Sequence, residues 1–317
     1  MSDDFPPEPD DQEPDDHGPD APESDEPAAP ETFHLGALAP GLYITATPIG
    51  NAKDISVRAL HAIENADVVL CEDTRVTSKL LAIYNLKAKL RPYHDHNAEY
   101  MRPRILAGIE SGQAIVLVSD AGTPLISDPG YKLVRDVRAA DLMVTTLPGA
   151  SSVLAALCIA GLPTDRFFFQ GFLPSKSTAR CRVLEELKPV PATLVILESA
   201  KRLARSLKDM DDVLGPRDAA VTRELTKRFE EVRTGTLAEL TAHYEEAGSP
   251  KGEVVLIIGP PNKAAESAAY DINAALQASL KTMTLKDAVK HVATQSGRPR
   301  KEVYTLALEL SQNLDQD

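Results

Sequence analysis

Residues 114–130 read Ala114-Ile-Val-Leu-Val-Ser-Asp-Ala-Gly-Thr-Pro-Leu-Ile-Ser-Asp-Pro-Gly130. The first five form a short, β-branched apolar run, which predicts a strand buried on both faces of a parallel sheet. The run stops at Ser119-Asp120, and two glycines and two prolines follow, which predicts a loop at the carboxyl end of the strand. Open α/β sheets bind ligands at such strand ends. We therefore expect a ligand here, with Gly122 allowing close backbone approach and Asp120 accepting hydrogen bonds from hydroxyl groups.

Similar strand-loop-helix units surround this stretch. Further β-rich runs, each ending in turn residues, lie at 42–47, 68–71 and 142–147. Helical patterns lie between them, one near 98–111 and one from about Tyr131. The alternation over residues 41–160 predicts a mostly parallel sheet.

The pattern changes after Gly161. Strands are predicted at 167–171, 192–197, 218–224, 229–234 and 253–259, with helices at 177–188 and from Thr236. The runs 218–224 and 229–234 are close enough to pair antiparallel, so we expect a second α/β module with a mixed sheet.

The two ends of the chain differ from these modules. The first 38 residues hold thirteen acidic side chains, no Lys or Arg and eight prolines, a composition typical of disorder. Residues after Pro260-Pro261 look like a linker, and roughly 280–312 predict two amphipathic helices with a basic turn at Gly297-Arg-Pro-Arg300. The expected domains are a tail at 1–38, α/β modules at 39–160 and 161–260, and a linker with a helix-turn-helix-like hairpin at 261–317.

Charge and cysteine content restrict the class of protein. The formal net charge of −13 is that of the acidic tail alone, so the rest of the chain is neutral. Cys71, Cys158 and Cys181 lie far apart with no CxxC, which favours free thiols over a disulfide framework. The N-terminus lacks the pattern of a signal peptide, and no apolar run approaches the length of a membrane span, so we expect a soluble, cytoplasmic protein.

Several nucleotide-binding and hydrolytic classes are excluded by motif. No two glycines are two positions apart, so the chain has neither a dinucleotide-binding fingerprint nor an ordinary Rossmann methyltransferase loop. GxxxxGK[ST] and GxSxG are also missing, which excludes a P-loop NTPase and the usual hydrolase nucleophile elbow.

Eight short motifs occur in a recognisable order. They are Thr47-Pro-Ile-Gly-Asn51, Glu72-Asp-Thr-Arg75, His94-Asp-His-Asn97, Ser119-Asp-Ala-Gly-Thr-Pro124, Asp128-Pro-Gly130, Gly171-Phe-Leu-Pro174, Arg223-Glu-Leu-Thr-Lys227 and Lys251-Gly-Glu253. Together they resemble the tetrapyrrole-methylase family of S-adenosylmethionine (SAM) enzymes, and within it the ribosomal RNA small subunit methyltransferase I branch. The resemblance covers about 40–260 and extends to the C-terminal helices, whereas the acidic tail has no counterpart in the family pattern.

This resemblance implies two α/β domains with SAM in the cleft between them, a homodimer, and 2′-O-methylation of a cytidine ribose in the decoding region of 16S rRNA. It also implies which residues contact the cofactor. They are Pro48, Asp120, Gly122, Thr123, Pro124, Ile126, Ser151 and Ser152, with Leu173 from the second domain.

The acid–base chemistry stays open. SAM carries its own leaving group, so alignment of the ribose oxygen with the methyl carbon is the main requirement, and a positioned base would help. Candidate bases are Glu72, Asp73, His94, Asp95, His96 and Glu198. The alternatives are catalysis by positioning alone and, for Asp73, a structural ion pair with Arg75. His94 and His96 lack a third ligand at metal-binding spacing, so we expect no metal.

RNA contact has to come from local basic patches, because the body of the chain has no net positive charge. Candidates near strand ends are Arg75, Lys176, Arg180, Arg182, Lys201, Arg202, Arg205, Arg223, Lys227 and Arg228. The alternative is that many of them are solvated surface cations. The basic C-terminal turn is a further candidate for nucleic-acid contact.

Two other functions remain open on the sequence. The first is a methyltransferase acting on a tetrapyrrole or corrinoid macrocycle. The basic C-terminal hairpin, the Arg/Lys-rich loops and the His94–Asn97 segment argue against it. The second is a non-catalytic SAM-binding ribosome assembly factor, because no single residue in the sequence shows that the protein catalyses a reaction.

Overall fold

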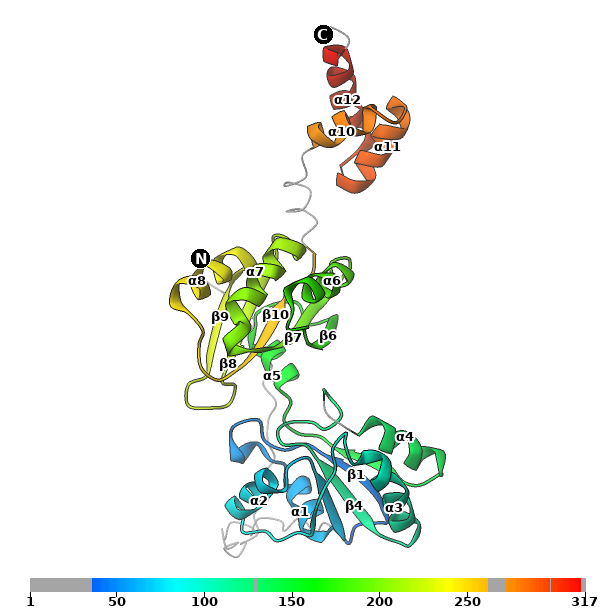
Figure 1. Ribbon diagram of the computed structural model, residues 1–317, viewed down its shortest axis with the longest axis vertical. Helices are drawn as coiled ribbons and strands as arrows, with labels where there is room; N and C mark the ends of the chain where they lie inside the picture. The colour runs from blue at the N-terminus through cyan, green and yellow to red at the C-terminus, as the bar shows by residue number, and fades with distance from the viewer. Residues whose placement is uncertain (1–35, 128–129, 262–271, 297, 315–317) are drawn as a thin grey trace, which may run out of the picture. The chain divides into compact units, whose positions relative to one another are not determined.

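The computed structural model describes residues 36–127, 130–261, 272–296 and 298–314. Within them, strands form two separate five-stranded sheets (Figure 1). The first has the order β3-β2-β4-β1-β5 and consists of β1 (Gly41–Thr45), β2 (Val68–Cys71), β3 (Leu90–Pro92), β4 (Ala114–Val118) and β5 (Val144–Leu147). All pairings among its described strands are parallel, with β4 between β1 and β2, as the alternation over 41–160 predicts.

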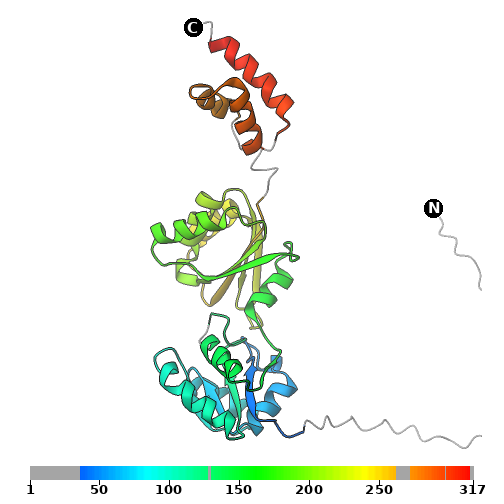
Figure 2. The ribbon, with the colours of Figure 1, turned by 90° about the vertical axis from the view of Figure 1, so that its right-hand side faces the viewer.

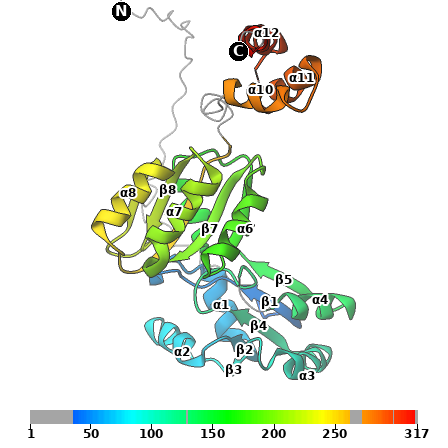
Figure 3. The ribbon, with the colours of Figure 1, turned by 45° about the horizontal axis from the view of Figure 1, so that its top comes forward.

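Helices cover both faces of the first sheet (Figure 3). Side chains of β4 alternate between the two sides: Ile115 and Leu117 pack with α3 (Ala98–Glu110) and α4 (Tyr131–Ala139). Val116 and Val118 pack with α1 (Val57–Asn65) and α2 (Thr74–Ile83). All five residues of β4 are buried, because a parallel strand between two helical layers has no solvent face.

The second sheet has the order β6-β7-β10-β8-β9 and is mixed, as expected. Its strands are β6 (Phe167–Phe172), β7 (Thr193–Ser199), β8 (Asp218–Arg223), β9 (Glu231–Thr236) and β10 (Glu253–Ile258). Only β6 and β7 pair in parallel among the described strands of this sheet, and β8 and β9 form the predicted antiparallel pair.

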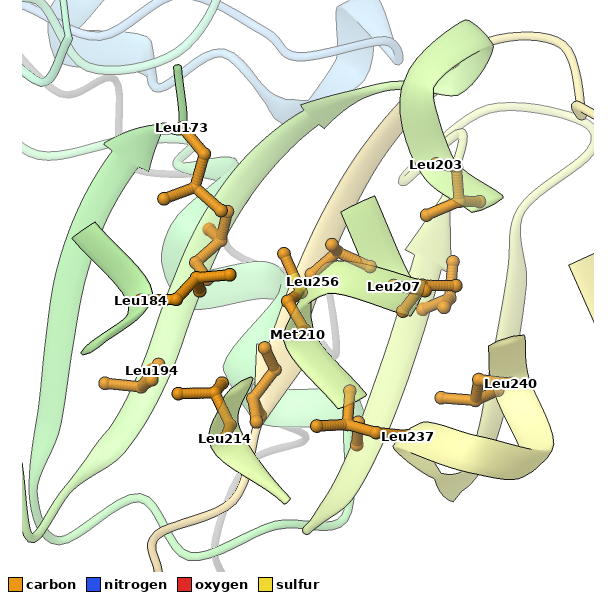
Figure 4. Packing of buried hydrophobic residues seen from close by; sticks show 14 of the residues in the cluster. Leu173, Leu184, Leu194, Leu203, Leu207, Met210, Leu214, Leu237, Leu240 and Leu256 are labelled. Carbon is orange, nitrogen blue, oxygen red and sulfur yellow. The ribbon is translucent and has the colours of Figure 1, made fainter. Parts of the chain in front are cut away.

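One face of this sheet carries a large hydrophobic cluster, part of which is shown in Figure 4. It packs against α6 (Ser177–Leu187), α7 (Leu203–Leu214) and α8 (Leu237–Ala247). Helix α8 is capped at its N-terminus by Thr236, whose side chain forms a capping box with Glu239. Helix α5 (Ser152–Ile159) packs on the opposite face (Figure 2).

The two modules share part of their core. Ile49, which follows β1, is buried in the same cluster as Leu225, Val195 and Val255 of the second module. This contact fixes the loop after β1 against the second sheet.

The last described segment is a small helical domain. Helices α10 (Ile272–Leu280), α11 (Leu285–Ser296) and α12 (Arg300–Leu314) pack around Leu276, Val292 and Val303. The predicted hairpin is therefore incomplete, because α10 occupies part of the expected linker. Residues 1–35 of the expected tail at 1–38 and residues 262–271 of the expected linker lie outside the described residues. No helix of the described chain has both the length and the apolar character needed to cross a membrane.

Candidate active site

Loops at the carboxyl ends of the parallel strands are joined by hydrogen bonds. Thr47, after β1, and Gly122, after β4, each donate a backbone N–H to the other's carbonyl, at 2.9 and 3.0 Å. The buried hydroxyl of Thr47 donates to the carbonyl of Ser119 at 3.1 Å. These bonds hold the loops after β1 and β4 together as one surface.

The loop after β5 joins the same surface. The hydroxyl of Thr123 donates to the carbonyl of Ala150 at 3.0 Å. A Cβ at Gly149 would lie 2.9 Å from the Cβ of Ala46. The segments after β1 and β5 therefore approach each other too closely for any residue larger than glycine at position 149. Gly122 has φ +81°, a left-handed conformation that favours glycine.

Asp120 is held at the centre of these loops. Its Oδ1 accepts the backbone N–H of Asp73, after β2, at 3.1 Å. Among the described residues, its Oδ2 has no donor within hydrogen-bond distance. The carboxylate is thus oriented by one neighbour and retains an acceptor for the hydroxyl groups of a ligand.

Backbone strain is concentrated in the same loop. Leu125 and Ser127 adopt left-handed conformations with φ of 73° and 66°. Non-glycine residues rarely do so, and such strain persists where the surroundings over-determine the backbone, typically at ligand sites.

A cavity of about 750 Å³ opens beside these loops, between the two modules. Its lining combines Asp120 and Ser152 with Ile49, Phe172 and Leu197. A smaller adjoining cavity is lined by four further residues from the expected cofactor set, namely Gly122, Thr123, Ile126 and Ser151, and again by Ser152. The larger volume falls within the roughly 300–1,000 Å³ of small-molecule sites, and the mixture of apolar walls with a few polar groups is typical of them.

Three expected cofactor residues lie outside both linings. Pro48 is half-buried and Pro124 is buried beside the lining loops. Leu173 is 2% exposed, and its side chain packs in the hydrophobic core with Leu184 and Leu194 (Figure 4). The Leu173 side chain is therefore not available to a ligand in the cleft, and a contact from this residue is left to its backbone.

Glu198 fails as a candidate base. Its side chain is fully buried and accepts hydrogen bonds from Arg202, from Ser206 and from the N–H of Ser199. Both carboxylate oxygens are occupied, and the Arg202 pair at 2.5 Å holds the group in place. We correct this candidate to a structural anion at the end of β7.

Asp73 forms the structural ion pair with Arg75 that the sequence left open. The two side chains are 2.6 Å apart, and Asp73 also caps α2 by accepting the N–H of Arg75. These bonds lower the pKa of Asp73 to about 2, which makes it a weak proton acceptor at neutral pH. Glu72 is exposed and lines neither cavity.

The histidines lie on a separate loop after β3. His94 and His96 have ring centroids 5.9 Å apart, and neither lines the two cavities of the cleft. Next to them, Tyr93, Asp95 and Arg102 line a third cavity of about 380 Å³. Among the described residues, no group of three or more His, Cys, Asp and Glu side chains is arranged to hold a metal ion.

Several expected RNA-binding cations are used inside the protein. Arg180 is 3% exposed, forms a 2.6 Å ion pair with Asp209 and donates to the carbonyls of Pro174 and Ser175. It is a structural cation, and its expectation as an RNA ligand is wrong. Arg223 pairs with Glu231 at 2.7 Å.

Other candidates differ in their availability. Arg202 is half-buried against Glu198, and Lys227 bridges Glu224 and Glu253 at 2.9 and 3.0 Å. Lys176 and Lys201 are exposed and have no carboxylate within ion-pair distance among the described residues, and Lys201 lines the cleft. The side chain of Arg75 is 87% exposed despite its pair with Asp73.

Some lining residues were not expected from the sequence. Lys251 and Gly252 of the Lys-Gly-Glu motif, together with Phe172, line the larger cavity. Both motifs contribute to the family resemblance, so the sequence singles out these residues, but it indicates no chemical role for them.

Family comparisons cover most of the chain. The model of the tetrapyrrole (corrin/porphyrin) methylases matches residues 41–241, and a model described as the RsmI C-terminal HTH domain matches 264–311. The chain is 47% identical over 274 residues to a ribosomal RNA small subunit methyltransferase I of Mesorhizobium japonicum, covering 86% of this chain and 93% of that protein. Identity to the protein of the same name from Erythrobacter litoralis is 51%, covering 86% and 96%.

Solved structures support the fold alone. Diphthine synthase aligns with a TM-score of 0.55 at 17% identity, covering 69% of this chain and 89% of that one. The methyltransferase CobJ aligns with a TM-score of 0.51 at 17% identity, covering 69% and 94%.

Proposed function

The chain belongs to the tetrapyrrole (corrin/porphyrin) methylase family of SAM-dependent methyltransferases, and from this premise we propose that it methylates the 2′-hydroxyl of a cytidine in the decoding region of 16S rRNA. The observation that carries the proposal is similarity at 47–51% identity, over 86% of the chain, to proteins named for methylation of small-subunit ribosomal RNA. The match of residues 264–311 to a helix-turn-helix domain supports a nucleic-acid substrate over a macrocycle.

The cleft residues fit SAM. Asp120 keeps a free carboxylate oxygen for the ribose hydroxyls of the cofactor, and Gly122 lets the backbone approach it. Ser151 caps α5, whose first turn lines the smaller cavity, and a helix N-terminus favours a carboxylate such as that of the methionine part. Thr123, Ile126 and Ser152 complete this wall. The remaining proposed contacts are Pro48, Pro124 and the backbone of Leu173.

SAM supplies an activated methyl group, so the protein has mainly to place the ribose oxygen in line with it and exclude competing water. The candidate bases Glu72, Asp73, His94 and His96 do not line the cleft, and the oxygens of Glu198 are occupied. We therefore propose catalysis by positioning, with the hydroxyl proton passing to solvent during or after methyl transfer. The active-site loops then act by holding two substrates rather than by moving a proton.

Exposed cations are proposed to bind RNA phosphates. Lys201 lines the cleft, Arg75 lies in the first turn of α2, Lys176 precedes α6, and Arg205 lies in the first turn of α7. Arg202, Arg223 and Lys227 take a secondary part, since their carboxylate partners already compensate their charge. The affinity for RNA then falls as the salt concentration rises. The slope of log affinity against log salt concentration is proportional to the number of phosphates contacted.

We also propose a cytoplasmic homodimer. Strand β6 lies at the edge of the second sheet, and Phe167, Phe168 and Phe172 on it are 45%, 42% and 58% exposed. An edge strand with exposed aromatic side chains is a surface that a second copy can cover. The proposed substrate, the small ribosomal subunit, supports the proposed cytoplasmic location.

Transfer of labelled methyl groups from SAM distinguishes the three candidate functions. We expect label in the RNA of small ribosomal subunits that lack the modification, and none on a corrinoid acceptor. Label on the corrinoid would indicate that the substrate is a macrocycle. Intact SAM binding without transfer to either acceptor would favour a non-catalytic binding protein.

A further inference from the structure

The loop that joins β8 and β9, residues 224–230, contacts the segment after β1 in the first module. Leu225 is 7% exposed and packs in the same cluster as Ile49, which lines the cleft. The hydroxyl oxygen of Thr226 accepts the N–H of Asn51 at 3.1 Å. A Cβ at Gly50 would lie 2.5 Å from Cγ of Lys227, so the two loops are in tight contact. We call residues 224–230 the β8–β9 loop.

This loop is rigid as well as attached. Glu224 and Thr226 adopt left-handed conformations with φ of 50° and 64°. The N–H of Thr226 donates to Glu230 at 2.6 Å, and Lys227 bridges Glu224 and Glu253, which lowers the pKa of Glu224. Glu253 itself lines the cleft. Strained backbone that is locked on several sides indicates a functional constraint.

The tip of the rigid loop carries an aromatic ring in solvent. Phe229 is 64% exposed, and the guanidinium carbon of the exposed Arg228 lies 5.5 Å from the centre of its ring. Arg228 has no carboxylate within ion-pair distance among the described residues, unlike Arg223 and Lys227 at the base. A ring and a free cation side by side provide a stacking face and a phosphate contact, which is the combination that binds single-stranded nucleic acid.

We propose that Arg228 and Phe229 form a stacking platform for an unpaired base of the RNA substrate, beside the methyl-transfer site. The RNA substrate itself rests on the proposed function. Sequence-specific recognition of RNA mostly targets unpaired nucleotides, whose exposed bases stack on aromatic side chains, so an enzyme that selects one nucleotide needs an element that holds neighbouring bases open. The β8–β9 loop meets this need, because Leu225 packs with Ile49 of the cleft while Phe229 at the tip is 64% exposed.

The test compares Phe229→Ala and Phe229→Trp with Tyr100→Ala. Tyr100 on α3 is a matched control, 61% exposed with Arg104 3.9 Å over its ring. For Phe229→Ala we expect unchanged SAM affinity and a KM for small subunits raised about tenfold, the loss expected for one stacked base, with kcat kept within about twofold. Phe229→Trp should restore KM, and Tyr100→Ala should leave it unchanged.

Binding of a short fluorescein-labelled single-stranded RNA separates this proposal from the proposed function. If the wild-type protein transfers no methyl group to subunits, the function fails, while weaker RNA binding by Phe229→Ala would still support the platform. Unchanged RNA binding by that variant would overturn the platform, as would an equal loss in Tyr100→Ala. A raised KM for subunits with unchanged RNA binding would assign Phe229 to a protein contact. Reduced SAM affinity would assign it to the attachment of the loop.

Discussion

Asp120 is a residue whose position in a ligand site the sequence predicts, but whose orientation only the structure explains. The end of a buried strand predicted a ligand site at this position, and the structure adds that the N–H of Asp73 orients its carboxylate. That partner comes from a different strand-end loop and leaves no trace in the local pattern. Leu173 shows the reverse, because its motif suggested a cofactor contact while its side chain is 2% exposed in the core.

The first prediction concerns the carboxylate of Asp120. Asp120→Asn should keep the fold but weaken SAM binding about tenfold or more, because a charged acceptor of hydroxyl hydrogen bonds becomes neutral. Isothermal titration calorimetry measures this, with Asp165→Asn at an exposed position as the matched control. Equal SAM affinity in Asp120→Asn and the wild type would remove the residue from the cofactor site.

The second prediction separates structural from RNA-binding arginines on one helix. Arg180→Ala should lower the free energy of unfolding by about 3 kcal/mol, because it leaves Asp209 largely buried without its cation. Arg182→Ala, exposed on the same helix, should change it by less than about 0.5 kcal/mol. Urea denaturation gives both values. If Arg180→Ala kept full stability but bound RNA more weakly, Arg180 would be an RNA-binding residue and not a structural cation.

Among the secondary-structure elements, prediction succeeded where a pattern was long or bounded by clear turn residues. Strand β4 and the antiparallel pair of β8 with β9 are confirmed. Strand β3 was missed because Leu90–Pro92 is too short to show a period and ends in proline. Helix α7 was not predicted, although its apolar residues recur at helical spacing. Helix α10 was hidden in a composition typical of linkers.

The third prediction tests the attachment of the β8–β9 loop to the loop after β1. Gly50→Ala should raise the Kd for SAM severalfold and lower Tm, because the added methyl group meets Lys227 at 2.5 Å and the backbone carbonyl of Leu225 at 3.0 Å. Gly36→Ala is the control, since a Cβ there has no neighbour within 4 Å among the described residues. Calorimetric SAM titration and thermal unfolding measure the two effects. Unchanged values for Gly50→Ala would mean that the contact plays no part in forming the cleft.

For the protein as a whole, the sequence established two α/β modules and a helical C-terminal segment, which the structure and the family comparisons confirm. The way the modules share a core could not be predicted, because Ile49 and Leu225 are separated by most of the chain and neither belongs to a periodic pattern.

The fourth prediction concerns self-association. Phe167→Asp should convert a dimer into a monomer, because it places a charge on the exposed edge strand that we propose a second copy covers. Light scattering coupled to size-exclusion chromatography measures the mass. Phe229→Asp, an equally drastic change at an exposed phenylalanine, should leave the dimer intact. A wild-type monomer, or a dimer that survives Phe167→Asp, would contradict this interface.

The most direct test of the central claim is to map the methyl group. Small ribosomal subunits lacking the modification are incubated with labelled SAM and the purified protein, and their RNA is digested with nucleases and analysed by mass spectrometry. The account predicts a single methyl group on the ribose 2′-oxygen of a cytidine in the decoding region. A methyl group on a base would contradict the proposed alignment of a hydroxyl with SAM, and the absence of label from 16S rRNA would contradict the RNA substrate.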